Sequence, residues 1–282
     1  MICIYHSIDL DGWASAAIVL KKYPEVKLFG YDYGQKIPNI PEDTEIILTD
    51  ISFPMEEMKK LKSKFKKVIW IDHHISAIKE FQKTFTKEEA DEFITEFPKT
   101  NELVSACELT WRYLYPDTEK LDSIELLGSY DSFRHKEANQ KFTEDETMNY
   151  QYGARSKANS PESCYDVIFK DDIHDIMNDG KIIFNYIKIE ARNAYEKLSF
   201  PMMIGGKKFI AINADRLNFK TFGIDYHADG YDGQACFRFQ DKIWKFSIYN
   251  ENGKIDCSEI AKKYGGGGHH GAAGFSLNRL PF

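Results

Sequence analysis

Acidic and histidine side chains gather at four places in the first half of the sequence, each where an apolar or helical segment ends. At one of these places, the buried-strand pattern 68–71 ends in one acid and two imidazoles. Three ionisable groups in a row are costly to bury unless a ligand, a metal or another charge pairs with them. Because four segments end in this way, a shared site explains them better than four unrelated surface turns. The residues concerned are His6, Asp9, Asp11, Asp50, Asp72, His73, His74 and Asp131.

Six of these residues form a candidate ligand set that is rich in oxygen, contains two imidazoles and has no thiolate. Such donors suit Mn²⁺ or Mg²⁺ better than structural zinc, which favours sulfur ligands in closed tetrahedral sites. Four carboxylates around one point repel one another unless divalent cations neutralise them. We therefore predict two bound Mn²⁺ ions, with Mg²⁺ or Co²⁺ as alternatives. The predicted metal ligands are His6, Asp9, Asp11, Asp50, His73 and Asp131.

Six ligands are too many for a single ion that also keeps open positions for a substrate. Two ions about 3.5–4 Å apart, bridged by a carboxylate and a hydroxide, satisfy the count. Such a pair lowers the pKa of bound water and holds the oxygens of an in-line displacement at phosphorus. The alternative is that the acids only cap helices and close turns, as Asp11 could do. That alternative requires all four segments to be coincidences.

The segments that must position these residues alternate between strand and helix patterns. Such alternation is typical of a parallel sheet with helical crossovers. Because the carboxyl ends of parallel strands meet at one edge, where ligands bind in open α/β sheets, we expect the ligand set to converge there. The predicted strands are 2–5, 26–33, 45–49 and 68–71, and the predicted helices between them are 12–23 and 54–66.

The chain from 76 to 200 is predicted to be mainly helical. Helical spacing is found at 101–114 and 121–128, whereas the polar segments 76–98 and 132–160 are interpreted as loops or short helices. Residues 161–200 are predicted to be helical and to connect two domains, with a long helix over about 181–198.

After Pro201 the pattern changes from helices to strands. Hairpin patterns occur at 202–213 and 235–249, and a short helix capped by Ser258 runs to Tyr264. The predicted fold is therefore α/β with two lobes, an N-terminal parallel-sheet domain and a smaller C-terminal α/β domain. The predicted divisions are a metal-binding catalytic domain at 1–160, a helical linker at 161–200 and a substrate-binding domain at 201–282.

Four consecutive glycines precede a histidine within the stretch 264–275. Glycine lets the backbone approach a ligand closely, and successive N–H groups can cradle a phosphate. The run is not a Walker-type loop, since no Gly-Lys-Ser/Thr follows, and its small flanking residues differ from a flexible linker. We predict that it binds a substrate phosphate, to which the histidine donates a hydrogen bond. The residues are Gly265, Gly266, Gly267, Gly268 and His269.

Composition and charge argue against several classes of protein. The 282 residues carry a net charge of −7, which disfavours a protein that coats long nucleic acids. No apolar stretch approaches the ~20 residues needed to cross a bilayer, and the first residues run straight into a polar motif. Five cysteines without paired spacing are typical of reduced thiols. We therefore expect a cytoplasmic protein that has no signal peptide and makes no membrane contact.

Taken together, these motifs resemble the DHH phosphoesterase family with its DHH-associated C-terminal domain. The segment 265–275 is similar to the glycine-rich signature of that second domain. The resemblance covers most of the chain, and the joint occurrence of the motifs in this order is highly specific. The four motifs of the first domain correspond to His6-x-x-Asp9-x-Asp11-Gly12, Thr49-Asp50, Asp72-His73-His74 and Tyr130-Asp131.

The resemblance implies two lobes around a cleft, with two Mn²⁺ ions in the first lobe and the substrate phosphate held by the second. By position, the ligands of one ion would be His6 and Asp9, those of the other Asp11, His73 and Asp131, and the bridge Asp50. His74 would lie near the scissile phosphate, and Asp72 would orient or support the site. These two are therefore the predicted catalytic residues.

Within the family, the short two-domain form is similar to nanoRNA-degrading oligoribonucleases and nucleoside bisphosphate phosphatases, and 129–134 looks closest to the oligoribonuclease branch. This implies hydrolysis of phosphodiester or phosphomonoester bonds in very short RNA or DNA oligonucleotides or small nucleotides, by attack of a metal-bridging hydroxide. Two alternatives stay open, a cyclic dinucleotide phosphodiesterase and a non-catalytic nucleotide-binding regulatory module. The sequence also leaves the oligomeric state open, a homodimer included.

One departure from the family pattern concerns the grip on a terminal phosphate. Many members carry Ser-x-Arg-Ser on the strand before the glycine segment, whereas this chain has Ser-Ile-Tyr-Asn at 247–250. Tyr249 cannot replace a bidentate guanidinium. Arg238, on the neighbouring predicted strand, is the candidate substitute. Otherwise the protein holds its substrate differently.

Overall fold

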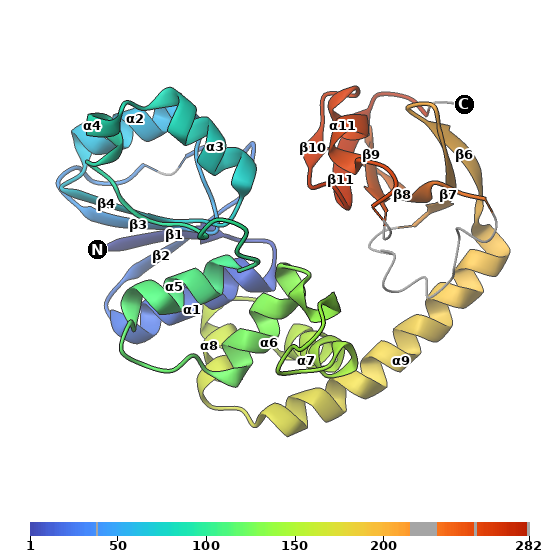
Figure 1. The fold of residues 1–282 in the computed structure, drawn as a ribbon, viewed down its shortest axis with the longest axis horizontal. Coiled ribbons are helices and arrows are strands. Elements are labelled where there is room, and N and C mark those ends of the chain that lie inside the picture. The colour runs from blue at the N-terminus through green and yellow to red at the C-terminus, as the bar shows by residue number, and fades with distance from the viewer. Residues whose placement is uncertain (38, 215–229, 251–252, 281–282) are drawn as a thin grey trace. The chain divides into compact units, whose positions relative to one another are not determined.

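The computed structural model describes residues 1–37, 39–214, 230–250 and 253–280 (Figure 1). The chain divides into two compact units, Met1–Phe184 and Asn185–Phe282. Each unit has its own sheet and is described by itself. Within the described residues, no helix combines the length and the apolar character that a membrane span requires.

A parallel five-stranded sheet forms the centre of the N-terminal unit. Its order is β2-β1-β3-β4-β5, and every neighbouring pair is parallel. The predicted parallel sheet is confirmed, whereas the short edge strand β5 was expected to be loop or helix. The strands are β1 (Ile2–His6), β2 (Lys27–Tyr31), β3 (Glu45–Thr49), β4 (Lys67–Ile71) and β5 (Ile94–Glu96).

Helices cover both faces of this sheet, which explains why its central strands are apolar on both sides (Figure 1). Alternate strand residues point into two separate cores, with Ile47 and Ile69 in one and Ile46 and Trp70 in the other. The first core is completed by α1 (Leu10–Lys22), α5 (Ala106–Leu114), α6 (Asp122–Asp131) and α8 (Pro161–Phe169). The opposite face carries α2 (Met55–Lys64), α3 (Ile75–Thr84) and the short α4 (Lys87–Ala90).

The structure differs from the predictions in three helices. Helix α5 begins at Ala106 rather than at 101, because Ser105 caps it with a reciprocal contact from Glu108. Residues 144–157, which were expected to be loop or short helices, form the continuous helix α7 (Glu144–Lys157) after a short 3₁₀ turn, η1 (Arg134–Lys136). The long helix α9 (Ile173–Leu198) begins eight residues before the predicted start at 181. The compact N-terminal unit extends to Phe184, so residues 161–184 of the predicted linker lie within it.

A six-stranded mixed sheet forms the C-terminal unit, in the order β10-β11-β9-β8-β7-β6. Among the described strands of this sheet, β7 and β8 are the one parallel pair, and both predicted hairpins are present. The cap of helix α11 is Asp256 rather than the predicted Ser258, because its carboxylate accepts from the backbone N–H groups of 258 and 259. The elements are β6 (Phe200–Ile204), β7 (Lys207–Asn213), β8 (Gly233–Gln240), β9 (Ile243–Tyr249), α11 (Cys257–Lys262), β10 (Gly267–Gly268) and β11 (Ala272–Leu277).

Candidate metal centre

The carboxyl edge of the N-terminal sheet brings together all six predicted metal ligands. Strands β1, β3 and β4 end at or directly before His6, Asp50 and Asp72, and helix α6 ends at Asp131. Three groups have ligand atoms that all lie within 4.8 Å of one another. The groups are His6–Asp9–Asp50, Asp11–His73–Asp131 and Asp50–His73–His74.

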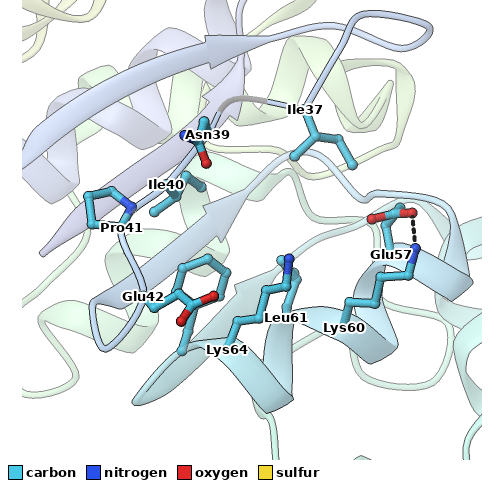
Figure 2. A pocket seen from close by; sticks show the side chains of 10 residues that line it. Ile37, Asn39, Ile40, Pro41, Glu42, Glu57, Lys60, Leu61 and Lys64 are labelled. Atoms are coloured by element: carbon cyan, nitrogen blue, oxygen red, sulfur yellow. Dashed lines mark hydrogen bonds and ion pairs between the residues drawn. The ribbon is translucent and has the colours of Figure 1, made fainter.

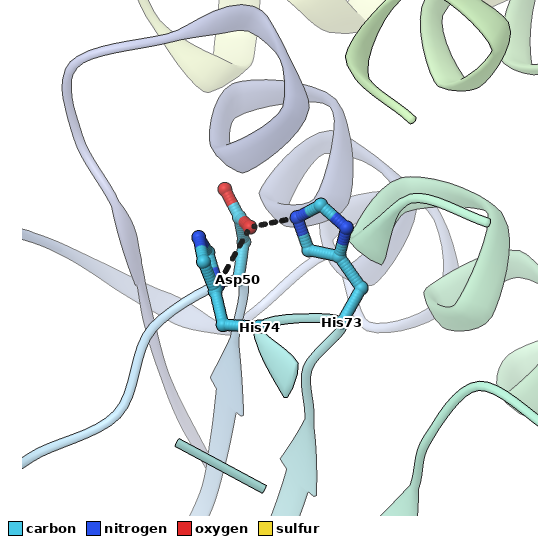
Figure 3. A group of neighbouring side chains, drawn as sticks. All are labelled: Asp50, His73 and His74. Carbon is cyan, nitrogen blue, oxygen red and sulfur yellow. Dashed lines mark ion pairs between the residues drawn. The ribbon is translucent and has the colours of Figure 1, made fainter. Parts of the chain in front are cut away.

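Asp50 and His73 each belong to two of these groups and therefore join them (Figure 3). The Nδ1 atom of His6 lies 2.9 Å from Asp9 Oδ2 and 3.4 Å from Asp50 Oδ2. The Nε2 atom of His73 lies 3.5 Å from Asp50 Oδ1, 3.4 Å from Asp131 Oδ2 and 3.8 Å from Asp11 Oδ2. Asp50 thus presents one oxygen to each half of the ligand set, as a bridging carboxylate would.

The surroundings of Asp50 test whether these residues fit a cation. The side chain is 1% exposed, and neither carboxylate oxygen has a hydrogen-bond partner in the described parts of the chain. Its backbone is also left-handed, with φ 59°. A buried carboxylate without hydrogen bonds is costly, and strained backbone at such a residue is typical of functional sites. A divalent cation on these oxygens would remove the electrostatic cost, so the residues fit the predicted metal pair.

Asp11 is held in place by the start of helix α5. Its Oδ2 accepts from the backbone N–H of Ala106 at 2.9 Å, and its Oδ1 accepts from that of Cys107 at 3.0 Å. The positive end of the helix dipole favours the carboxylate there. Gly12 allows the close approach of α1 to β1, because a Cβ at Gly12 would lie 1.9 Å from the carbonyl oxygen of His6. The first motif is therefore packed against α5 at Asp11 and against β1 at Gly12.

The two predicted catalytic residues contact each other directly. Asp72 is fully buried, and its Oδ1 accepts from the backbone N–H of His74 at 3.0 Å. The same oxygen lies 2.7 Å from His74 Nδ1, which orients the imidazole. The Nδ1 atom also lies 3.8 Å from Asp50 Oδ1. Asp72 therefore contacts both the backbone and the ring of His74.

The crowded charges shift the pKa values of the site in opposite directions. Burial lowers the pKa of His6, but Asp50 and Asp9 outweigh it and raise that pKa to about 11. Burial likewise lowers the pKa of His73, but Asp50, Asp131 and Asp11 outweigh it and raise that pKa well above its usual range. Burial raises the pKa of Asp131 to about 6 and also raises that of Asp11. Burial alone would raise the pKa of Asp50, but the imidazoles hold it well below its usual range.

Metal binding is expected to release protons and to strengthen as the pH rises. The pKa of His6, about 11, means that this imidazole is protonated in the metal-free protein at pH 8, and the carboxylates around His73 favour its protonated form as well. A ligating imidazole must be neutral, so binding displaces at least one proton per chain. Higher pH lowers the cost of this displacement. Titration calorimetry with Mn²⁺ at pH 8, in buffers of different ionisation enthalpy, measures the number; no proton release would contradict the assignment.

An ion-pair network beside the centre was not predicted from the sequence. Arg134 donates to both oxygens of the buried Glu108, at 3.0 and 2.8 Å, and to Glu125 at 2.7 Å. Lys120 also pairs with both carboxylates. Glu108 belongs to the capping box of α5, the helix that holds Asp11. The capping box is the part of this network that the sequence could have revealed. No local sequence pattern links Glu108 to Arg134.

A second missed residue is Tyr33, in the loop after β2. Its ring centroid lies 6.1 Å from that of His6. Asp32 precedes it, with Oδ1 3.7 Å from His6 Nε2. An aspartate and a tyrosine after an uncertain strand carried no distinguishing pattern in the sequence.

The predicted substrate-binding glycines lie at the edge of the C-terminal sheet. Gly267 and Gly268 form β10, and a tight turn follows, in which the backbone N–H of His269 donates to Ala272 at 2.7 Å. A Cβ at Gly266 would lie 2.1 Å from Gly274 O, and one at Gly268 would lie 2.6 Å from the backbone of β11. Close sheet packing thus accounts for two of the four glycines, and phosphate binding by the segment stays a prediction.

The structure does not bring Arg238 next to the glycine segment. Strand register pairs Arg238 with Lys245, whereas Tyr249 pairs with Gln234 and with Ala272. Arg238 and Tyr249 therefore share a face of the sheet but lie four residues apart along the strands, about 13 Å at 3.3 Å per residue. A phosphate at the tyrosine position would be out of reach of the guanidinium without a large movement.

A separate pocket of about 310 Å³ lies at the opposite, amino ends of β3 and β4 (Figure 2). It is lined by residues of the segment 37–42 and of α2, including Ile40 and Lys64. Glu57 and Lys60 form an ion pair of 2.7 Å at its rim. It contains none of the candidate ligands and is not used in the function proposed below.

Two comparisons match this chain with known sequences. Residues 1–132 match the family model described as the DHH family, N-terminal domain. An uncharacterised protein, R106, of Acanthamoeba polyphaga mimivirus is 22% identical over 310 aligned residues, which cover 99% of this chain and 68% of that protein.

Two solved structures are similar to the fold. A pGpG-specific phosphodiesterase, PggH, from Vibrio cholerae has a TM-score of 0.51 and 14% identity, covering 98% of this chain and 92% of that one. An exopolyphosphatase-related protein from Bacteroides fragilis has a TM-score of 0.52 and 14% identity, covering 99% and 87%. The matched family segment includes every predicted metal ligand. Within the N-terminal unit, residues 1–132 are therefore similar to the N-terminal domain of the DHH family.

Proposed function

We propose that this protein is a metal-dependent phosphoesterase that hydrolyses very short oligonucleotides or small nucleotides, with two Mn²⁺ ions as its cofactors. The observation that carries the proposal is the buried carboxylate of Asp50, whose oxygens accept no hydrogen bond within the described residues and face ligand groups on both sides. A site with one structural ion would not need a shared carboxylate. A non-catalytic binding module would not need two complete ligand groups.

In this proposal each half of the ligand set holds one ion. His6 and Asp9 would hold one ion, Asp11, His73 and Asp131 would hold the other, and Asp50 would contribute to both. When bound, such a pair supplies an activated water and neutralises charge on the phosphoryl oxygens. Side chains of the protein carry out the remaining steps, which are orientation of the substrate and proton transfer. Asp72 holds Nδ1 of His74, so that Nε2 can hydrogen-bond to a phosphoryl oxygen or hand a proton to the leaving oxygen.

The comparisons support the reaction class. The segment similar to the DHH-family domain contains the whole ligand set, and one neighbour with the same fold is described as a phosphodiesterase. The finer assignment to the oligoribonuclease and bisphosphate phosphatase branch rests on the sequence motifs. The net charge of −7 is consistent with small substrates, since long strands are bound through extended basic surfaces.

The proposal predicts a preference for substrates of a few nucleotides. Purified protein with Mn²⁺ would be assayed at equal concentrations of a dinucleotide, a nucleoside bisphosphate, a cyclic dinucleotide, a long single strand and inorganic pyrophosphate. We expect the dinucleotide or the bisphosphate to be hydrolysed fastest. Faster processive digestion of the long strand, or hydrolysis of pyrophosphate alone, would overturn the proposal. Tight binding of nucleotides with no turnover under any metal would favour the regulatory module instead.

A further inference from the structure

Tyr33 lies beside the metal centre and is partly open to solvent. Its hydroxyl lies in the neighbourhood of Ser52, two residues after Asp50. The residue is 51% exposed. The ring centroid lies 6.1 Å from that of His6, at an interplanar angle of 57°. The sequence motifs assign no role to this residue.

Other exposed apolar side chains adjoin the same candidate ligands. Ile8 lies between His6 and Asp9 and is 61% exposed, and Ile75 follows His74 and is 50% exposed. Phe133 lies two residues after Asp131, is also exposed, and has a left-handed backbone, φ 59°. Bulky residues rarely adopt that conformation unless the surrounding structure imposes it. These apolar side chains are next to candidate ligands in the sequence, where an apolar part of a substrate could contact them.

We propose that Tyr33 is a specificity-determining residue whose exposed ring stacks on a nucleobase of the substrate while the adjoining phosphate lies at the metal centre. The inference rests on the proposed function and adds a recognition residue to it. A nucleobase is joined to its phosphate through one ribose, so a base next to a bound phosphate lies at the rim of the site. Every base has an aromatic face, so such a contact selects nucleotides over inorganic phosphates without selecting a sequence.

The proposed contact uses the face of the ring rather than the hydroxyl, because a base stacks on the aromatic face of its partner. Tyr33→Phe should therefore keep most of the recognition, whereas Tyr33→Leu should remove it.

A double-mutant cycle between protein and substrate tests the inference. The wild-type protein, Tyr33→Phe and Tyr33→Leu would be assayed on a dinucleotide and on analogues that lack one base or the other. Stacking on an aromatic ring contributes about 1–3 kcal/mol per base, so Tyr33→Leu should lower kcat/KM for the intact dinucleotide by about 5- to 150-fold. The loss should fall mainly on KM. On the analogue that lacks the stacked base, Tyr33→Leu should have little further effect.

Several outcomes would overturn the inference. An equal loss for Tyr33→Leu on all substrates would mean that Tyr33 only supports the centre. An equal loss for Tyr33→Phe and Tyr33→Leu would mean that the hydroxyl, not the ring, is what the substrate uses. Failure of the proposed function is distinguishable, because the wild-type protein would then not hydrolyse the dinucleotide at all. Binding of a non-hydrolysable 2-aminopurine dinucleotide to the otherwise wild-type protein with Mn²⁺ gives a second readout, since stacking on Tyr33 should quench its fluorescence and Tyr33→Leu should abolish the quenching.

Discussion

Asp50→Asn is expected to lower kcat/KM by about 10³-fold or more and to reduce bound metal from two ions per chain to one at most. The carboxylate faces both ligand groups, so its loss removes a charge from each. Charge stabilisation by a metal centre is worth several kcal/mol, and about 4 kcal/mol corresponds to roughly 10³-fold. Asparagine is nearly isosteric and tolerates the left-handed backbone of this position, so the fold should be retained. Turnover and metal analysis on the same preparation measure both effects.

Asp43→Asn is a matched control for this variant. Asp43 has the same left-handed φ of 59°, is exposed, and lies before β3, at the opposite end of that strand from Asp50. The control should keep both ions and near-normal turnover. If Asp50→Asn retained two ions and more than about a tenth of the activity, the bridging assignment would be wrong. If both variants lost activity alike, the effect would come from the backbone position rather than from the charge.

Arg134→Leu is expected to destabilise the N-terminal unit by about 3–5 kcal/mol, because it leaves the carboxylate of Glu108 buried with fewer partners. Glu108 is 3% exposed, and Arg134 donates to both of its oxygens. At about 2–4 °C per kcal/mol, the midpoint of thermal unfolding should fall by roughly 6–20 °C. Metal affinity should also weaken, since the α5 terminus that caps Asp11 lies in the same network. Scanning calorimetry of the metal-free protein measures the first effect.

Arg112→Leu provides the comparison for a half-exposed network. Arg112 pairs with Glu96 at 2.6 Å and with Glu102 at 2.7 Å, but both carboxylates are partly exposed. Solvent-exposed pairs contribute about 0–1 kcal/mol, so this variant should lose little stability. The double variant Arg134→Leu with Glu108→Gln should recover part of the loss by removing the buried charge. Equal midpoints for the two single variants would show that burial of Glu108 does not dominate the energetics.

The sequence by itself determined which residues meet at the candidate centre. An apolar run that is typical of a strand ends at or directly before each of His6, Asp50 and Asp72. The alternation of strands and helices indicates that these strands are parallel. Parallel strands share one carboxyl edge, so proximity in space followed from local patterns and a topological rule. Asp131 follows a helix pattern, and a helix end carries no comparable topological rule, so its inclusion rested on the chemistry of the donor set and on the resemblance to the DHH family.

Only the tertiary structure decided how the centre is held and what surrounds it. The capping of Asp11 by α5 joins residues 95 positions apart, and the contact between Arg134 and Glu108 joins residues 26 apart. Tyr33 is brought to His6 by the parallel pairing of β1 with β2. By contrast, the strand register separates Arg238 from Tyr249. An alternating sequence pattern does not determine this register, because a shift by two residues keeps the same side chains on the same face of the sheet. Local patterns specify the element and its faces, whereas these contacts depend on the packing of elements distant in the chain.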